Sequence, residues 1–342
     1  MEAKLTSVSG VDVSDASDVA DDIFHGDDLV NALVVQRSRT YVKKSLSNEE
    51  GDKVQFSERQ APIVAKYSLE DSYGELIDHF VKSFERKDKS GKKKLPILAL
   101  AVYSPYEDTY YIGDKSKIDD MKSGRQQQVV NLIRQLLLKR FESSIEAFAE
   151  TCIRIYVRLK KFMTDYQEYG NPKQIERLFD KQEEIIAFAE KFIEDNISSV
   201  DEFEDDLPEY VWEAEENLDV KDFDIRAMLD DTILDLEVLA QFIEDIMGFD
   251  SDNDDKIHEL INILRNDEHI QGRKVIVFSE YRATAKYIYR ELEKAGFNNI
   301  AEIDGQSKVN RHELIKRFAP YYNGASSSEI DDLQNKTAPK DG

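Results

Sequence analysis

The chain has 342 residues, a formal net charge of −24 at pH 7 and 41% hydrophobic residues. This length allows two domains with buried cores, and no apolar run is long enough to span a membrane. The N-terminus lacks a signal-peptide pattern, and the single cysteine excludes an internal disulfide and a multi-cysteine zinc site. We therefore expect a cytoplasmic protein without a membrane partner.

The negative charge is concentrated in one block of the chain. Residues 173–255 contain 29 Asp and Glu but only 6 Lys and Arg, a net charge of −23. The flanking regions are therefore close to neutral. Only the acidic block has a charge that argues against nucleic-acid binding.

The N-terminal third mixes polar and helical patterns. Residues 1–27 are small, polar and acidic, which predicts a flexible tail or linker. A helix is expected over 27–45, with a basic stripe that includes Arg37 and Arg39. Apolar and polar residues alternate over 61–69, which predicts a short strand.

The middle of the chain has helical spacing. Apolar residues recur at steps of mostly three and four from Arg125 to about Tyr169, which predicts a long helix that Gly170-Asn171-Pro172 ends. A return helix over 173–196 completes an antiparallel hairpin. The lone Cys152 lies on the apolar stripe and is expected to pack in the core.

Residues 198–255 interleave carboxylates with aromatic residues. One interpretation is a solvated insertion between two lobes, and the other is a surface that docks a basic protein partner or mimics DNA. A helical stripe is clear only over 228–247. The sequence SDNDD at 251–255 lacks the spacing of a calcium loop.

The region 272–320 alternates between the two kinds of secondary structure. The apolar run Val275–Phe278 predicts a parallel strand that is covered on both faces. A helix over 282–295, a short strand over 299–303 and a helix over 309–318 should follow. This order predicts a βαβα unit of an open α/β sheet. The fold class is therefore mixed, mainly α, with a partial α/β unit at the C-terminal end.

Three motifs in this region carry a family resemblance. They are VIVFSEY at 275–281, IDGQS at 303–307 and R-x3-I-x2-F at 311–318. In this order and spacing they resemble the start of the second RecA-like lobe of Swi/Snf-related superfamily-2 DNA helicases of the bacterial type. The resemblance implies a middle segment of such a helicase or translocase.

The resemblance also implies a division of the chain. The expected parts are a flexible tail or linker at 1–27, the end of lobe one with a protrusion at 28–124, an acidic helical insertion at 125–255, the first part of lobe two at 256–330, and a flexible tail at 331–342.

ATP and Mg²⁺ are the cofactors that the resemblance implies for the intact parent protein. Their binding needs a phosphate loop with a Lys and an Asp-Glu pair after a strand. The pair Gly91-Lys92 lacks the rest of a phosphate loop, and Asp267-Glu268 follows a helical pattern. We therefore expect no cofactor and no ATP hydrolysis for this chain alone, which is either an excerpt or a truncated form.

The expected partner is the phosphate backbone of DNA. In an open α/β sheet, ligands meet the carboxyl ends of the strands, where hydroxyls and helix N-terminal amides suit phosphates. With the resemblance, this reasoning selects as nucleic-acid-binding candidates Ser279, Tyr281, Arg282, Gly305, Ser307, Arg311, Arg37 and Arg39. Structural roles remain open for the arginines. A second class of function also remains open, that of a non-catalytic acidic protein that binds a basic partner.

Overall fold

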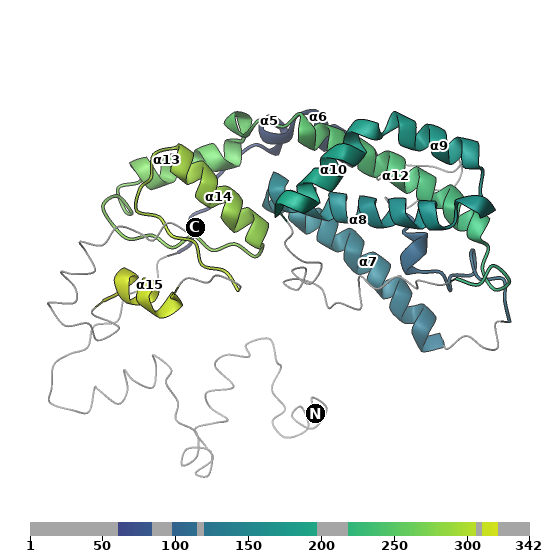
Figure 1. Cartoon of the computed structure of the whole chain (residues 1–342). Helices are drawn as coiled ribbons and strands as arrows, with labels where there is room; N and C mark the ends of the chain where they lie inside the picture. Colours follow the sequence, from purple (N-terminus) through teal and green to yellow (C-terminus); the bar gives the residue numbers. More distant parts are fainter. Residues whose placement is uncertain (1–60, 84–97, 115–119, 197–217, 306–309, 321–342) are drawn as a thin grey trace, which may run out of the picture. The chain divides into compact units, whose positions relative to one another are not determined.

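Figure 1 shows the computed structural model, which describes residues 61–83, 98–114, 120–196, 218–305 and 310–320. The chain divides into two compact units, Met1–Val64 and Ala65–Gly342. Only 61–64 of the first unit are described. The predicted tail and the predicted basic helix with Arg37 and Arg39 lie outside the described residues.

The described part of the second unit is mainly helical, as predicted. Its elements, labelled as in Figure 1, are α5 (Leu69–Tyr73), α6 (Glu75–Ser83), η2 (Ala101–Tyr103), α7 (Asp120–Ser143), α8 (Ile145–Asp165), η4 (Gln167–Tyr169), α9 (Pro172–Lys181), α10 (Glu183–Asn196), α12 (Ile225–Met247), η6 (Ser251–Asn253), α13 (Asp255–Asn266), α14 (Arg282–Lys294) and α15 (Arg311–Phe318).

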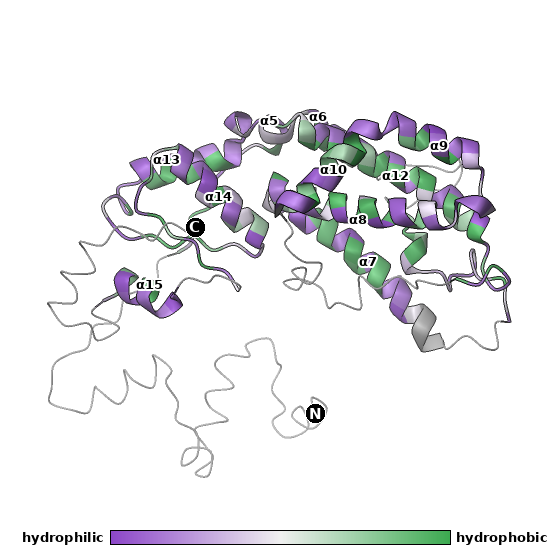
Figure 2. Cartoon of the chain, in the orientation of Figure 1, coloured by the Kyte–Doolittle hydropathy of each residue, from purple (hydrophilic) through white to green (hydrophobic). Residues whose placement is uncertain are grey.

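Helix α8 lies at the centre of the core. It packs against α7, α10, α12 and α14, and Figure 2 shows apolar residues recurring along α7, α8 and α12. Its side chains Phe148, Ile155 and Leu159 are fully buried. Cys152 is also fully buried, and burial raises the pKa of its thiol well above its usual value. The prediction that this cysteine packs in the core is therefore confirmed.

The predicted long helix over 125–169 is wrong in one respect, because Ser144 divides it into α7 and α8. Ser144 has an extended backbone, and its Oγ accepts a hydrogen bond from Ala147 N at 3.2 Å. This is an N-cap, which begins a new helix. The apolar stripe continues across the break, since Phe141 and Ile145 are both buried.

Gln182 similarly divides the predicted return helix into α9 and α10. Its buried side-chain amide accepts a hydrogen bond from Tyr156 Oη at 2.8 Å and donates one to Leu236 O at 3.4 Å. The return itself is confirmed, since α10 packs against α8 and Lys160 Nζ lies 2.7 Å from Glu190 Oε1. A buried amide with both partners satisfied costs little and links three helices.

The strand predictions are wrong for the described residues. Residues 61–68, 274–279 and 299–303 have no regular secondary structure, and the described part of the chain contains only one isolated bridge, between Tyr111 and Phe223. A strand exists only with a hydrogen-bonded neighbour, and Val275–Phe278 has none in the described region. The mainly α part of the fold class is confirmed, and the partial α/β sheet is not formed here.

The helices of the C-terminal region agree with their predictions. Helix α14 runs from Arg282 to Lys294, and Gly296 follows it with a left-handed φ of 88°. A glycine is favoured there because it has no Cβ to clash. Helix α15 starts at Arg311, where Asn310 Oδ1 accepts from Glu313 N at 3.3 Å, and it ends before Pro320.

Helices α5 and α13 cap each other across a long stretch of sequence. Ser68 N donates to Asp255 Oδ2 at 2.6 Å, and Asp255 N donates to Ser72 Oγ at 3.1 Å. Next to this pair, the buried carboxylate of Asp254 caps α13 and accepts from Tyr287 Oη at 2.8 Å. These hydrogen bonds join the start of the described chain to α13 and α14.

Tyr103 is a buried tyrosine whose hydroxyl has no hydrogen-bond partner among the described residues. We expect Tyr103→Phe to raise the free energy of unfolding by about 1 kcal/mol at neutral pH, because it removes a desolvated polar group that gains no bond on folding. Urea unfolding followed by circular dichroism measures this change. A loss of stability would contradict it.

Tyr110→Phe is the matched control, because the Tyr110 hydroxyl donates to Asp231 Oδ2 at 2.8 Å. This control should lower the stability by about 1 kcal/mol.

Burial raises the pKa of Tyr103 from 10.0 to about 12. The Tyr103 hydroxyl therefore loses its proton at a lower pH in the unfolded chain than in the folded chain. The wild-type chain should lose stability as the pH rises from about 10 to about 12. Tyr103→Phe should lose less stability over this range, because it lacks this hydroxyl.

Candidate nucleic-acid interface

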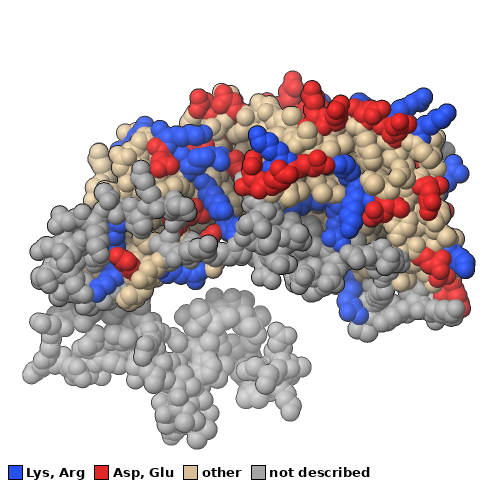
Figure 3. All heavy atoms as spheres, in the orientation of Figure 1, with Lys and Arg blue, Asp and Glu red and all other residues tan. Residues whose placement is uncertain are grey.

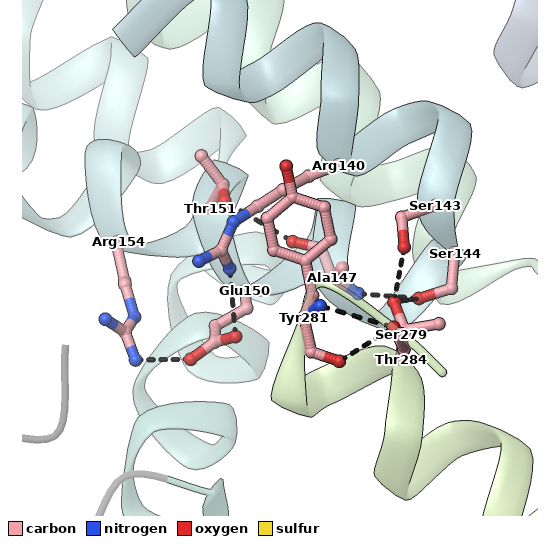
Figure 4. Close-up of polar contacts among 10 residues, drawn as sticks. All are labelled: Arg140, Ser143, Ser144, Ala147, Glu150, Thr151, Arg154, Ser279, Tyr281 and Thr284. Carbon is pink, nitrogen blue, oxygen red and sulfur yellow. Dashed lines mark hydrogen bonds and ion pairs between the residues drawn. The ribbon is translucent and has the colours of Figure 1, made fainter. Parts of the chain in front are cut away.

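The first candidate turn precedes α14. The Ser279 hydroxyl accepts a hydrogen bond from Tyr281 N at 3.2 Å and donates one to Tyr281 O at 3.1 Å (Figure 4). These two local bonds fold the chain into a compact turn that delivers Arg282 as the first residue of the helix. Ser279 itself is exposed.

The second candidate turn lies beside the first. Arg282 Nε is 3.7 Å from Asp304 Oδ2, and the two side chains are 15% and 13% exposed. Arg311 Nη2 donates to Asp304 O at 2.8 Å and also to Gly305 O. The chain thus brings together Arg282, Gly305 and Arg311, which were selected from the sequence. Ser307 lies outside the described residues.

Arg311 is exposed but has a structural role as well. Its guanidinium holds two consecutive carbonyls of the second turn. The sequence left open a structural ion pair for this arginine, and the described contacts are instead hydrogen bonds to the backbone. A guanidinium has five N–H donors, so these bonds leave donors that can face a phosphate.

Tyr281 is buried, at 3% exposure, and its expected contact with DNA does not fit this position. Its ring lies under the guanidinium of Arg140, whose Cζ is 4.9 Å from the ring centroid. Arg140 also pairs with Glu150 at 3.1 Å, and Arg154 bonds to the same carboxylate (Figure 4). Tyr281 therefore attaches the first turn to α7 and α8.

Thr284 forms the second attachment of α14. Its Oγ1 lies 2.7 Å from both Ser143 Oγ and Ser144 Oγ at the break between α7 and α8 (Figure 4). Lys256 Nζ donates to Ser143 O at 2.8 Å, and also to the preceding carbonyl, at the end of α7. This joint was not predicted from the sequence. The local signal was the pair Ser143-Ser144 shortly before the acidic Glu146, a pattern that is typical of a helix N-cap.

The charges around the two turns are mixed. Glu280 Oε1 lies 3.6 Å from Lys139 Nζ, and both side chains are more than half exposed, so this ion pair is weak. Figure 3 shows Lys and Arg interspersed with Asp and Glu over the face of the molecule that it displays. Of the selected arginines in the described region, Arg311 is the one with an exposed side chain.

The described region contains neither a metal-binding group of side chains nor a membrane-spanning helix. Within it, no group of three or more His, Cys, Asp and Glu side chains could hold a metal ion. None of the described helices is both long and apolar enough to cross a membrane.

Comparisons of the chain with protein-family models, with curated proteins and with solved structures found no match. The function is therefore inferred from the residues and contacts of this chain.

Proposed function

We propose that this chain is a segment of a Swi/Snf-like, ATP-dependent DNA helicase or translocase, and that its own role is to contact the DNA backbone. The observation that carries the proposal is the ion pair between Arg282 and Asp304, which holds the turn 279–282 beside residues 304–305. In open α/β proteins, ligands bind where such turns meet. A finer expectation, still a proposal, is that 274–318 completes a RecA-like sheet in the parent protein.

The chemistry of the paired turns suits phosphate. Arg311 offers an exposed guanidinium that the backbone carbonyls orient, whereas the Ser279 hydroxyl already donates its proton to Tyr281 O. Helix α14 begins at Arg282 without a side-chain capping bond, and helix N-termini attract anions. None of these groups reads a base, so we expect binding that is independent of DNA sequence.

The proposal assigns no ATP chemistry to this chain. The described residues lack a set of Mg²⁺ ligands, and the sequence lacks a phosphate loop. ATP and Mg²⁺ would bind to other parts of the parent protein. The helices α7–α12, which make up the predicted acidic insertion, would select a substrate or a basic protein partner.

Duplex binding measured by fluorescence anisotropy at several salt concentrations tests the proposal. We expect affinity to fall steeply with salt, because phosphate contacts release counterions. Arg311→Ala should weaken binding to all duplexes alike and lower the salt slope by about 1. Arg311→Lys should retain the slope, because the charge remains.

Arg177→Ala is the matched control. It removes the same charge from an exposed position of α9, outside the two turns, and should leave the affinity and the slope unchanged. No duplex binding at low salt would reject the proposal and favour an acidic interaction protein. Equal losses for Arg311→Ala and Arg177→Ala would remove the site assignment alone.

A further inference from the structure

Residues Val275–Phe278 form an extended apolar segment that is open to solvent. The exposed fractions of the four side chains are 40% for Val275, 54% for Ile276, 43% for Val277 and 88% for Phe278. Within the described part of the chain, their backbone N–H and C=O groups make no hydrogen bond. An exposed, apolar and unpaired segment of this kind is a template for pairing with another strand.

Both ends of the segment are held in place. At the start, Lys274 Nζ donates to Arg317 O at 2.8 Å and to Phe318 O at 2.9 Å, at the C-terminus of α15. At the end, the Ser279 hydroxyl folds the turn that leads to α14. The extended conformation therefore costs little further ordering when a partner strand arrives.

The sequence of the segment is complementary to itself. Residues 274–280 read Lys-Val-Ile-Val-Phe-Ser-Glu. In an antiparallel pair centred on Val277, Val277 faces its own copy, Ile276 faces Phe278, and Lys274 faces Glu280 at both ends. Apolar pairs and opposite charges across strands are both stabilising. A parallel pair in register would instead place like charges together.

We propose that this segment pairs antiparallel with the same segment of a second copy of the chain, around a two-fold axis at Val277. The terminal charges can adapt to this pairing. Lys274 uses two of its three ammonium donors on carbonyls. Among the described residues, Glu280 pairs with Lys139 alone, and this exposed pair can be exchanged. The pairing does not require DNA, and it applies to this chain by itself, because the sheet proposed for the parent protein would occupy the same segment.

Oxidative cross-linking of the full chain tests the register. Paired residues of antiparallel strands have Cα atoms roughly 4.5–5.5 Å apart, within reach of a disulfide. Val277→Cys should therefore give a covalent dimer under mild oxidation. Val275→Cys is the matched control, because it faces Ser279 and should stay monomeric. The native Cys152 is fully buried. Equal cross-linking of the two variants, or none, overturns the proposal.

Charge exchange measured by sedimentation provides the second test. The wild-type chain should dimerise in a concentration-dependent way. Lys274→Glu alone or Glu280→Lys alone should weaken the dimer by about tenfold, since each change acts twice across the axis. An equimolar mixture of the two single variants should recover the wild-type affinity, because their ends are complementary.

Recovery in the mixture also shows that both variants are folded. A wild-type chain that stays monomeric at every concentration overturns the proposal. A dimer that is indifferent to both exchanges overturns it too, because another surface would then form the contact. Unchanged helical circular dichroism of each variant separates a loss of pairing from unfolding.

Discussion

Asp235→Ala is expected to lower the free energy of unfolding by about 3–5 kcal/mol, which is the scale for removing one partner of a buried charged network. Asp235 lies within α12 and is completely buried. Its two carboxylate oxygens accept hydrogen bonds from Ala99 N at 2.8 Å and from Leu100 N at 2.7 Å. The alanine variant would leave the buried amide of Leu100 and the half-buried amide of Ala99 without this acceptor.

The segment that Asp235 holds is also constrained from the other side. Arg134 donates from Nε and Nη2 to Leu98 O at 3.0 and 2.6 Å. Burial lowers the pKa of Arg134, and the charge of Asp235 opposes this effect. Leu100 has a left-handed φ of 56°, which is unfavourable for a side chain that carries a Cβ. The carboxylate therefore stabilises a conformation that Leu100 would otherwise avoid.

Urea unfolding monitored by circular dichroism measures this effect. Asp230→Ala is the control, because it removes a carboxylate from an exposed position of the same helix and should change the stability by under about 0.5 kcal/mol. Asp235→Asn should fall between the two, since one amide oxygen can replace only part of the carboxylate. A loss below about 1 kcal/mol for Asp235→Ala would contradict the assigned role.

Phe148→Ala should lower the free energy of unfolding by about 3–5 kcal/mol, because the cavity that it leaves is surrounded by rigid neighbours. The Phe148 ring is completely buried. It lies edge-on to Phe141 at 5.1 Å and to Phe80 at 5.7 Å, and is tilted to Phe242 at 5.6 Å between centroids. This cluster joins α6, α7, α8 and α12.

The same unfolding measurement tests this prediction, with Phe188→Ala as the control. Phe188 is only half-buried, with Phe192 as its ring neighbour at 6.3 Å. Its removal should cost less than half as much as that of Phe148, because solvent can fill the space. Equal losses would show that the four-ring cluster is not the centre of the core.

The helices could be predicted because their signal is local. The stripe over 228–247 predicted α12, which begins three residues earlier at Ile225. The breaks at Ser144 and Gln182 were not predicted. The apolar spacing continues through Ser144, and the break at Gln182 depends on partners that are remote in the sequence. Tyr156 and Leu236, which bond the Gln182 amide, come from other helices.

The strands could not be predicted, because a strand is defined by its neighbour. The pattern of Val275–Phe278 is correct for an apolar strand, yet the described residues supply no hydrogen-bonded partner. The alternation at 61–69 similarly ends in a capped helix, where Ser68 Oγ accepts from Asp71 N at 3.0 Å. Hydrophobic pattern reports burial and spacing, whereas pairing depends on the rest of the fold.

The candidate site could be predicted in part. The two turns chosen from the sequence lie together, as the Arg282–Asp304 pair shows, although the strands whose carboxyl ends suggested them are not formed in the described residues. The prediction failed for Tyr281, because Arg140, which covers the ring, comes from a distant helix. The role of Asp235 had a detectable signal, since its carboxylate lies on the same helical stripe as Thr232 and Leu239, which are buried.

The mutual capping of α5 and α13 has a consequence for how this chain could have been assembled. Asp255 bonds both Ser68 and Ser72, so the chain leaves α5 and returns to the same point at α13. A segment whose two ends lie side by side can be gained, lost or exchanged as a unit. The segment α6–α12 between these two points could therefore be inserted into, or removed from, another chain as one unit. A host chain would need to supply the contacts that Tyr281, Thr284 and Lys256 make with α7 and α8.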